Sequence, residues 1–340
     1  MKHKNLLIET ANNMVKKGKG ILAADESNPT CGKRFDSIGV ESSFENRNEY
    51  RDMLFSAKGI EEYISGVIMF DETFRQSTTC DNKINFPEYL TSKGIIPGIK
   101  VDTGAKDLAG FSNEKITEGL DGLRERLVEY FDMGARFAKW RAVINIDQTL
   151  PSLGAIEANT HALARYAALC QENGIVPIVE PEVLMDGGHD INRCYEVSCQ
   201  TLDILFDQLS RLNVMLEGIV LKPNMIISGL DCGNQASVSK VAELTFKCLK
   251  DNVPSDVPGI AFLSGGQSSD LATAHLNEMN MKYMDDMPWN LTFSYGRALQ
   301  EDALKKWGGS NREDAQKALM NRAESNSLAT NGKATDLINS

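Results

Sequence analysis

Charged side chains interrupt several short apolar runs of this 340-residue sequence. Lys222 is the clearest case, because Gly218-Ile-Val-Leu221 precedes it and Pro223 follows it. A lysine amine is ordinarily protonated at neutral pH, but burial and a neighbouring cation both favour its neutral, nucleophilic form. A neutral amine can attack a ketone, lose water and form an iminium, which withdraws electrons from the adjacent C–C bond. We therefore interpret Lys222 as the candidate nucleophile, with Lys139 and Lys100 as competitors that the residue types alone do not exclude.

Other charged residues in similar runs could assist this chemistry. Lys139 could supply the cation near Lys222. Dehydration and proton transfer need a general acid and base, for which Glu180 or Glu182 is available. Cleavage of the C–C bond also needs a base for the proton of the departing hydroxyl, and Asp25 fits that role.

These side chains can act together only if the fold brings them together. Short runs rich in β-branched residues alternate along the chain with longer segments of helical period. Strands are predicted at Gly20–Glu26, Gly66–Glu72, Ile95–Asp102, Arg136–Ile146, Ile175–Glu182, Leu216–Asn224, Gly259–Gly266 and Leu291–Arg297. Helices are predicted at Lys115–Met133, Ala155–Asn173 and Ile191–Asn213. Successive strands begin roughly 30–45 residues apart, which is the length of a strand–helix unit.

Eight such units predict an α/β fold of the (β/α)8 TIM barrel type, which usually takes about 250 residues. The alternative is a doubly wound sheet, which usually carries a glycine-rich phosphate loop that this sequence lacks. No linker interrupts the pattern, so we predict a single domain over residues 1–340 with a barrel core over about 18–308. Residues 309–340 are rich in Ser, Asn, Ala and Thr, and we predict that they form a mobile tail.

A barrel brings the carboxyl ends of its strands to one mouth, where enzymes of this fold have their catalytic residues. Polar or charged residues end each predicted strand. The cations among them are Lys100, Lys139, Arg141, Lys222 and Arg297, and the accompanying carboxylates are Asp25, Glu180 and Glu182. So many cations within a chain of net charge −11 predict an anionic substrate. Ser264-Gly265-Gly266 and Arg297 stand where barrels commonly bind a phosphate group.

Several other classes of protein are disfavoured. The net charge of −11 argues against nucleic-acid binding. The four histidines are not at metal-ligand spacing, so we predict no metal and no cofactor. The N-terminus lacks the apolar stretch of a signal peptide, and no window is long enough for a membrane helix. The seven cysteines contain no Cys-x-x-Cys pair, so we expect a cytoplasmic enzyme with reduced thiols.

Seven segments in chain order carry a family resemblance. They are Gly20-Ile-Leu-Ala-Ala-Asp-Glu-Ser27, Gly98-Ile-Lys-Val-Asp102, Phe137-Ala-Lys-Trp-Arg141, Val179-Glu-Pro-Glu182, Leu216-Glu-Gly-Ile-Val-Leu-Lys-Pro-Asn-Met225, Phe262-Leu-Ser-Gly-Gly-Gln267 and Thr292-Phe-Ser-Tyr-Gly-Arg-Ala-Leu299. Together they resemble the class I fructose-bisphosphate aldolases over about residues 18–332. The resemblance implies a cytosolic homotetramer that needs no metal. Such an enzyme reversibly splits the phosphorylated ketose fructose 1,6-bisphosphate into dihydroxyacetone phosphate and glyceraldehyde 3-phosphate.

The resemblance also implies a role for each catalytic candidate by its matching position. Lys222 would form the Schiff base, and Glu180 would be the main acid and base for forming and dehydrating the carbinolamine. Glu182 would be the electrostatic partner of Glu180. Lys139 would stabilise charge on the intermediates, and Asp25 would take the proton of the C4 hydroxyl.

Two further sets of residues would hold the two phosphate groups. The set at the ketone end is Ser264, Gly265, Gly266 and Arg297. The set at the aldehyde end is Ser27, Lys100 and Arg141, with Lys33 or Arg34 nearby. After Ser27 the chain reads Asn28-Pro29-Thr30 where the family commonly has Thr-Gly-Ser. Pro29 stiffens this loop and removes one N–H donor, so binding of the distal phosphate is expected to differ in detail.

A second departure concerns the enamine. Many animal members of the family end in a tyrosine that assists proton transfer, whereas no tyrosine follows Tyr295 here. We expect Glu180 or water to serve instead, so that removal of residues 330–340 leaves turnover nearly unchanged.

Two alternatives to this function stay open at the level of sequence. One is a Schiff-base aldolase for another ketose phosphate, such as sedoheptulose 1,7-bisphosphate or fructose 1-phosphate. The other is a non-catalytic scaffold or adhesin barrel, which is disfavoured because an unused cluster of buried charges is costly.

Overall fold

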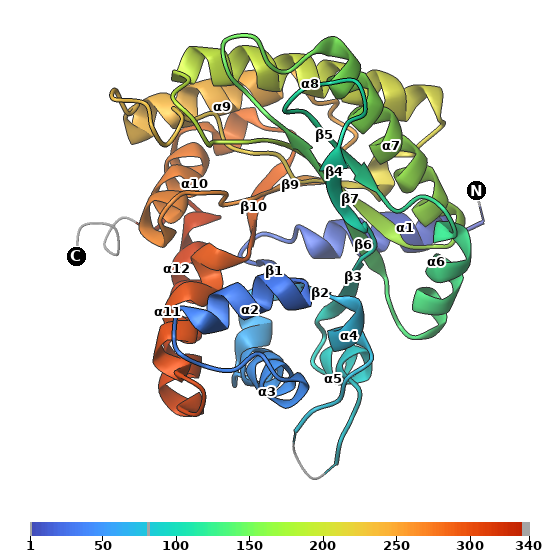
Figure 1. Ribbon diagram of the computed structural model, residues 1–340, viewed down its shortest axis with the longest axis vertical. Helices are drawn as coiled ribbons and strands as arrows, with labels where there is room; N and C mark the ends of the chain where they lie inside the picture. The colour runs from blue at the N-terminus through green and yellow to red at the C-terminus, as the bar shows by residue number, and fades with distance from the viewer. Residues whose placement is uncertain (1, 80–81, 335–340) are drawn as a thin grey trace.

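The computed structural model describes residues 2–79 and 82–334. Its centre is a closed barrel of parallel strands with helices outside (Figure 1). The barrel strands are β1 (Gly20–Ala24), β2 (Ile64–Met69), β3 (Ile96–Lys100), β6 (Phe137–Ile144), β7 (Val176–Val183), β8 (Val220–Leu221), β9 (Gly259–Phe262) and β10 (Asn290–Tyr295). They follow one another around the barrel in the order β1-β10-β9-β8-β7-β6-β3-β2. The predicted (β/α)8 barrel is confirmed, and each predicted strand overlaps one strand of the barrel. Strands β2, β8 and β10 nevertheless end before Glu72, Lys222 and Arg297, which the prediction placed inside strands.

Helices surround this barrel, and a small hairpin packs beside β6. The α-helices are α1 (Lys4–Met14), α2 (Asn28–Asp36), α3 (Phe44–Phe55), α4 (Asp71–Phe74), α5 (Phe86–Ser92), α6 (Leu123–Asp132), α7 (Leu153–Glu172), α8 (Ile191–Arg211), α9 (Val238–Asn252), α10 (Ser269–Tyr283), α11 (Arg297–Trp307) and α12 (Arg312–Ala329). The short 3-10 helices are η1 (Ile60–Glu62), η2 (Leu216–Gly218) and η3 (Met284–Asp286). The hairpin consists of β4 (Gly104–Asp107) and β5 (Lys115–Glu118).

The alternation of side chains along each strand determines what fills the barrel. On β6, Phe137 belongs to the inner apolar cluster, while Lys139 and Arg141 line a cavity at the carboxyl end. Trp140, on the opposite face of the same strand, packs among the residues of the outer core, with its ring centroid 5.6 Å from that of Tyr166 on α7. The inward face of β6 is therefore apolar at its start and charged at its end.

Helix α1 covers the amino end of the barrel. Its residues Leu7, Ala11 and Met14 are fully buried in the inner cluster that also contains Phe137. Beside Phe137, a Cβ atom on Gly98 would lie 2.2 Å from the aromatic ring, so only glycine fits there. This end of the barrel is filled with side chains, whereas a cavity opens at the carboxyl end.

One predicted helix begins later than expected. The helix predicted over Lys115–Met133 begins at Leu123, and Lys115–Glu118 instead forms strand β5 of the hairpin. Gly119 and Gly122 have φ angles of +126° and +66°, a backbone conformation that interrupts a right-handed helix. The helices predicted at Ala155–Asn173 and Ile191–Asn213 correspond to α7 and α8.

The prediction of a mobile tail from residue 309 is wrong for the described part of that segment. Arg312–Ala329 form α12, which packs against α11, α10 and α3 (Figure 1). Ala315, Leu319 and Ala323 are fully buried, and Asn326 accepts a 2.8 Å hydrogen bond from Thr273. The small and polar side chains that suggested a tail instead allow close helix packing. Residues 335–340, which the truncation prediction also concerns, lie outside the described residues.

Candidate active site

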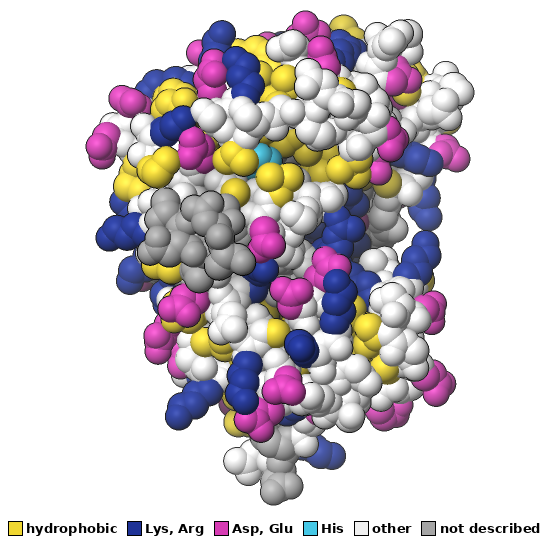
Figure 2. Space-filling model, turned by 90° about the vertical axis from the view of Figure 1, so that its left-hand side faces the viewer, with side chains coloured by type: hydrophobic (Ala, Val, Ile, Leu, Met, Phe, Trp, Pro, Cys, Tyr) yellow, Lys and Arg dark blue, Asp and Glu magenta, His cyan; other side chains and the backbone are white. Residues whose placement is uncertain are grey.

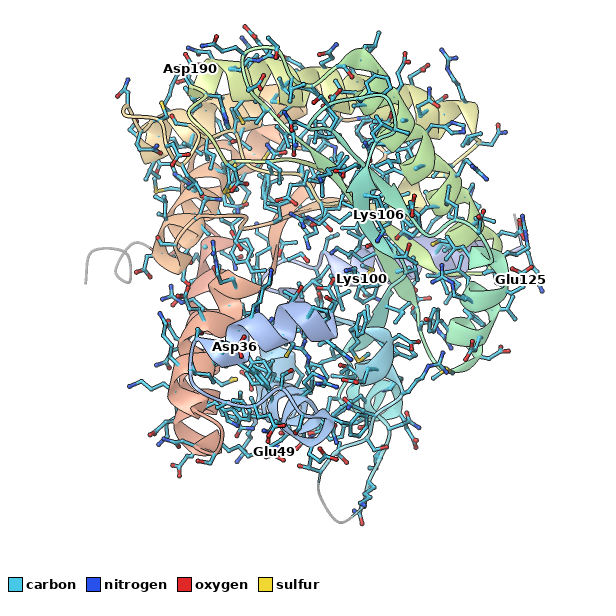
Figure 3. All side chains as sticks on the ribbon, in the orientation of Figure 1. Asp36, Glu49, Lys100, Lys106, Glu125 and Asp190 are labelled. Carbon is cyan, nitrogen blue, oxygen red and sulfur yellow. The ribbon has the colours of Figure 1, made fainter. Side chains whose placement is uncertain are left out.

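A cavity of about 280 Å³ opens at the carboxyl end of the barrel strands. Its charged lining is Asp25, Glu26, Arg34, Lys100, Asp102, Lys139, Arg141, Glu180, Glu182 and Lys222. Figure 3 shows Lys100 near the middle of the molecule, with Lys106 above it on the hairpin. Figure 2 shows the molecule turned by 90°, so that the left-hand side of Figure 1 faces the viewer. Basic side chains gather along a hollow of the surface in this view.

Four buried charged groups form a continuous chain at the bottom of this cavity. Lys222 Nζ lies 3.2 Å from Glu180 Oε1, and the other oxygen of Glu180 lies 3.3 Å from Lys139 Nζ. Lys139 Nζ also donates a 3.0 Å hydrogen bond to Asp25 Oδ2. None of the four residues is more than 9% exposed. Two amines therefore share one carboxylate, and the two lie on opposite sides of it.

The environment of Lys222 favours its neutral amine. Burial lowers the pKa of Lys222, and the positive charge of Lys139 lowers it further. The carboxylate of Glu180 opposes both effects but does not outweigh them, so the pKa lies below the ordinary lysine value. A neutral amine is the form that attacks a carbonyl carbon.

The pKa of Lys139 is shifted in the opposite direction from that of Lys222. Burial alone would lower the pKa of Lys139, but Asp25 and Glu180 outweigh burial and raise its pKa. Burial alone would likewise raise the pKa of Asp25, yet Lys139 and Lys222 hold the pKa of this carboxyl well below its usual range. Lys139 is therefore a fixed cation, and Asp25 is an ionised carboxylate beside it.

Glu180 is also ionised in this arrangement. Burial would raise the pKa of Glu180, but the positive charges of Lys139 and Lys222 outweigh burial and lower its pKa. An ionised Glu180 can accept a proton from the Lys222 ammonium 3.2 Å away. After that transfer it carries a proton that it can donate to a leaving hydroxyl.

The other cations that line the cavity, beyond Lys139 and Lys222, are also paired with carboxylates. Arg141 Nε hydrogen-bonds Glu182, which is 4% exposed, and Lys100 Nζ lies 3.6 Å from Asp102. Glu26 lies on the loop after β1, 2.5 Å from Nη1 of Arg34 on α2. A phosphate group entering the cavity would compete with these carboxylates for the same cations.

The start of α2 lies at the rim of the cavity. Ser27 is the N-cap of this helix, and its hydroxyl lies 3.1 Å from that of Thr30. Pro29 occupies the first turn, where an α-helix does not use the backbone N–H that proline lacks. The departure at Asn28-Pro29-Thr30 is thus a rigid first turn of helix, whose amino end attracts anions.

The Ser264–Gly266 loop lies on another side of the mouth. Gly265 has a φ angle of +55°, and a Cβ atom there would lie 1.8 Å from the Met185 side chain. Arg297, at the start of α11, donates a 3.0 Å hydrogen bond to the Gly265 carbonyl. Ser264 and Gly265 line the cavity, while Arg297 holds the loop from outside.

Comparison with known proteins identifies the family. Residues 6–339 match the family described as class-I fructose-bisphosphate aldolase. The chain belongs to this family.

Individual relatives of this class-I aldolase cover nearly its whole length. The probable fructose-bisphosphate aldolase class 1 of Xanthomonas axonopodis pv. citri is 57% identical over 96% of this chain and 98% of its own. Fructose-bisphosphate aldolase 4, cytosolic, of Arabidopsis thaliana is 51% identical over 93% of this chain and 80% of its own. The fructose-bisphosphate aldolase of Plasmodium falciparum, solved with TRAP and a small-molecule inhibitor, superposes with a TM-score of 0.95. It is 46% identical and covers 98% of this chain and 96% of its own.

The barrel of this aldolase brings together most of the residues predicted from sequence. The cavity is lined by Asp25, Ser27, Arg34, Lys100, Lys139, Arg141, Glu180, Glu182, Lys222, Ser264 and Gly265. Gly266 and Arg297 adjoin this lining without belonging to it, and Lys33 is exposed on α2 away from it. The charged end of the strand predicted at Gly66–Glu72 does not line the cavity either; Glu72 lies in α4 and pairs with Arg47 on α3.

Two carboxylates of the cavity stood at predicted strand ends but were left out of the candidate site, and the residues that hold one of them were missed. Glu26 and Asp102 raise the number of lining carboxylates above the three expected. Glu26 Oε2 lies 2.6 Å from Arg51 of α3, which is 2% exposed, and Gln300 donates a 3.1 Å hydrogen bond to Glu26 Oε1. Glu26 directly follows Asp25 in the sequence, and this position could have predicted that Glu26 also lines the cavity. Arg51 lies in a polar helix, and nothing in the sequence singles it out.

The described residues contain no group of three His, Cys, Asp or Glu side chains arranged to hold a metal ion. Throughout residues 2–79 and 82–334, no helix combines the length and apolar character that crossing a bilayer requires.

Proposed function

We propose that this class-I fructose-bisphosphate aldolase cleaves fructose 1,6-bisphosphate through a Schiff base on Lys222. The observation that carries the proposal is the buried chain Lys222–Glu180–Lys139–Asp25, with contacts of 3.2, 3.3 and 3.0 Å. In this chain the Lys222 amine, whose pKa is lowered, contacts the Glu180 carboxylate, which can accept and donate the proton of that amine.

In the proposed first half-reaction, the neutral amine of Lys222 attacks the C2 ketone to give a carbinolamine. Glu180, carrying the proton that it accepted from the Lys222 ammonium, first donates this proton to the alkoxide oxygen at C2. It then takes the extra proton from nitrogen and donates it to the resulting hydroxyl, which leaves as water. Loss of water leaves an iminium linking Lys222 to C2. Lys139 remains a cation beside Glu180 and stabilises negative charge that develops there.

Cleavage of the C3–C4 bond then uses Asp25, at the other end of the buried chain of charged groups. Asp25 removes the proton of the C4 hydroxyl, and the electrons of the C3–C4 bond move to the iminium to give an enamine. Glyceraldehyde 3-phosphate is released. Protonation of the enamine at C3 and hydrolysis of the resulting iminium release dihydroxyacetone phosphate and regenerate Lys222.

The two ends of the cavity suit the two phosphate groups. We propose that Ser264, Gly265, Gly266 and Arg297 hold the phosphate at the ketone end. We propose that Ser27, Lys100, Arg141 and Arg34 hold the phosphate at the aldehyde end. The start of α2 adds backbone N–H groups to this second set. No observation favours another ketose phosphate or a non-catalytic role.

The remaining properties are proposed from the family. We propose that the chain acts as one domain, assembles as a homotetramer, works in the cytoplasm and needs no metal. Size-exclusion chromatography with light scattering tests the assembly, since a mass of one chain would contradict it.

Borohydride trapping tests the central step. The protein is incubated with dihydroxyacetone phosphate and a chelator, reduced, digested and analysed by peptide mass spectrometry. We expect the reduced adduct on Lys222, its loss in Lys222→Met, and its retention in Lys106→Met, which changes an exposed lysine of β4 (Figure 3). An adduct on Lys139 or Lys100 would overturn the assignment of the nucleophile. No adduct on active protein would overturn the Schiff-base mechanism.

A further inference from the structure

The Ser264–Gly266 loop, which we propose to bind the phosphate at the ketone end, is connected to helix α10 by two buried hydrogen bonds. Gln267 Nε2 donates a 3.1 Å hydrogen bond to the Ser264 carbonyl oxygen. The amide oxygen of the same Gln267 lies 2.5 Å from Nδ1 of His275, which belongs to α10. Gln267 is 4% exposed and His275 is 2% exposed, so water does not compete for either hydrogen bond.

The chemistry of these groups fixes the direction of both hydrogen bonds. The Ser264 carbonyl can only accept, so the nitrogen of the Gln267 amide must face it and the amide oxygen must face His275. Met225 Sδ, 3.7 Å from the same nitrogen, is likewise an acceptor. Burial lowers the pKa of His275 to about 4, so the ring is neutral near pH 7 and holds one proton. That proton lies on Nδ1, which donates to Gln267.

The hydrogen bond to Ser264 sets the direction of a neighbouring donor. The carbonyl of Ser264 and the N–H of Gly265 belong to one planar trans peptide group, in which the C=O and N–H bonds point in opposite directions. The Ser264 carbonyl points to the buried Gln267 amide, so the Gly265 N–H points the other way. Ser264 and Gly265 line the active-site cavity, whereas Gln267 does not. This is the arrangement that an N–H donor to an anion in the cavity requires.

Two further contacts hold the same loop. The backbone N–H of Gln267 donates a 3.1 Å hydrogen bond to the Ser264 carbonyl and closes a tight turn. Arg297, at the start of α11, donates to the next carbonyl along the loop, that of Gly265, at 3.0 Å. The closed turn is therefore tied to α10 and to α11 through two successive carbonyls.

We propose that Gln267 is a positioning residue for the phosphate at the ketone end, and that it acts by orienting the Ser264–Gly265 peptide group. Gln267 does not touch the substrate, whereas the Gly265 N–H that it directs does. His275 holds the Gln267 amide in the orientation that this requires. The inference rests on the proposed function, because it concerns the phosphate that this loop is proposed to bind.

Two ketones separate positioning from a general role in stability. Dihydroxyacetone phosphate and dihydroxyacetone share the ketone that reacts with Lys222, but only the first has a phosphate. A residue that only supports the fold should affect the trapping of both ketones alike. A residue that orients a phosphate donor should affect the phosphorylated ketone alone. The ratio of the two trapping rates is therefore the readout, each measured on the full chain with cyanoborohydride below ligand saturation.

Gln267→Met keeps the length of the side chain and removes its amide. We expect it to lower the trapping rate of dihydroxyacetone phosphate by about 3–10-fold, the effect of one hydrogen bond, and that of dihydroxyacetone by less than about twofold. Gln171→Met is the matched control, because Gln171 is also a buried glutamine, but its amide donates to the carbonyls of Met215 and Gly218. The ratio of rates in this control should equal that of the unaltered protein.

The other end of the connection offers a second pair of variants. His275→Leu removes the donor to Gln267, so the ratio of rates should fall in the same direction as in Gln267→Met. His275→Asn places an amide N–H near the position of Nδ1, so the ratio should stay near that of the unaltered protein. These variants decide the outcome even if Gln267→Met does not fold.

Equal losses with both ketones in Gln267→Met would overturn the proposal, and so would an unchanged ratio in both Gln267→Met and His275→Leu. Calorimetric titration with dihydroxyacetone phosphate repeats the comparison without trapping. A weaker affinity in Gln267→Met would support the positioning role even if no adduct formed on Lys222. That missing adduct would contradict the proposed Schiff-base function alone, so the two failures are distinguishable.

Discussion

At the residue scale, two neighbours of Lys222 act on its pKa in opposite directions. Lys139 lowers the pKa of Lys222 by repulsion between like charges, and Glu180 raises it by attraction. Burial, the largest effect, favours the neutral amine in either case. The site thus lowers the pKa of the Lys222 amine while placing a proton acceptor 3.2 Å from it.

These opposing effects predict that two variants shift the pKa of Lys222, and with it the midpoint pH of adduct formation, in opposite directions. Adduct formation rises with pH as Lys222 loses its proton, and its midpoint reports the pKa of this amine. Lys139→Met removes the repelling charge, so the midpoint should move to higher pH. Glu180→Gln removes the attracting charge, so the midpoint should move to lower pH. The initial rate of cyanoborohydride trapping with dihydroxyacetone phosphate, followed by mass spectrometry across pH, measures both midpoints.

Lys106→Met serves as the control for this titration, because Lys106 is exposed and lies on the hairpin outside the cavity lining. Its midpoint should match that of the unaltered protein. Shifts of Lys139→Met and Glu180→Gln in the same direction would contradict the electrostatic account, whatever the two variants do to the maximal rate.

At the element scale, α3 supports the loop that carries Asp25. Arg51 of α3 is 2% exposed and lies 2.6 Å from Glu26, which follows Asp25 directly. Arg51→Met should lower the free energy of unfolding by about 3–5 kcal/mol, because it leaves a buried carboxylate without one of its two cations. Urea unfolding measures the loss. Arg75→Met is the control, since the Arg75 side chain is 43% exposed and its ion pairs should contribute about 1 kcal/mol or less. Equal losses in the two variants would show that α3 does not support the site in this way.

Helix α12 provides a second prediction at this scale. Leu319 is fully buried, whereas the Lys317 side chain is 65% exposed. Leu319→Ala should lower the free energy of unfolding by about 2–5 kcal/mol through the cavity that it leaves. Lys317→Ala should change it by about 0.5 kcal/mol or less, since its ion pair with Glu313 is exposed. Thermal or urea unfolding separates the two, and a neutral Leu319→Ala would restore the idea of a loose tail.

The elements differ in how far the sequence could predict them. The eight strands were predictable because short runs rich in β-branched residues alternate with segments of helical period, and the alternation on β6 already placed Lys139 and Arg141 on one face. Helix α12 was not, because its buried face consists largely of alanine, whose burial depends on partners far away in the chain. The role of Arg51 was hidden for the same reason, since only the fold shows that it meets Glu26. Local pattern therefore predicted most of the charged side chains that line the cavity, and tertiary contacts were needed to find the residues that support them.

At the scale of the whole molecule, the site concentrates buried charge inside an acidic protein. Burial would raise the pKa values of Asp25, Glu26 and Glu180, but neighbouring Lys and Arg side chains outweigh burial and lower all three. Between the folded and unfolded pKa values, the unfolded chain binds more protons than the folded one. Stability therefore rises with pH in that interval.

Acid should accordingly destabilise the fold, and Glu26 offers the clearest measurement. Its contribution is fully present above its unfolded pKa, near the ordinary value of 4.5, and is lost as pH falls through its lower folded pKa. Glu26→Gln should therefore reduce the free energy of unfolding more at pH 7 than at about pH 3, because acid has already removed part of the ionic contribution from the unaltered protein. Urea unfolding at both pH values measures this double difference. Glu313→Gln, whose side chain is 81% exposed, should show almost no change at either pH. A loss for Glu26→Gln that is the same at both pH values would mean that Glu26 stabilises the barrel by shape and not by charge.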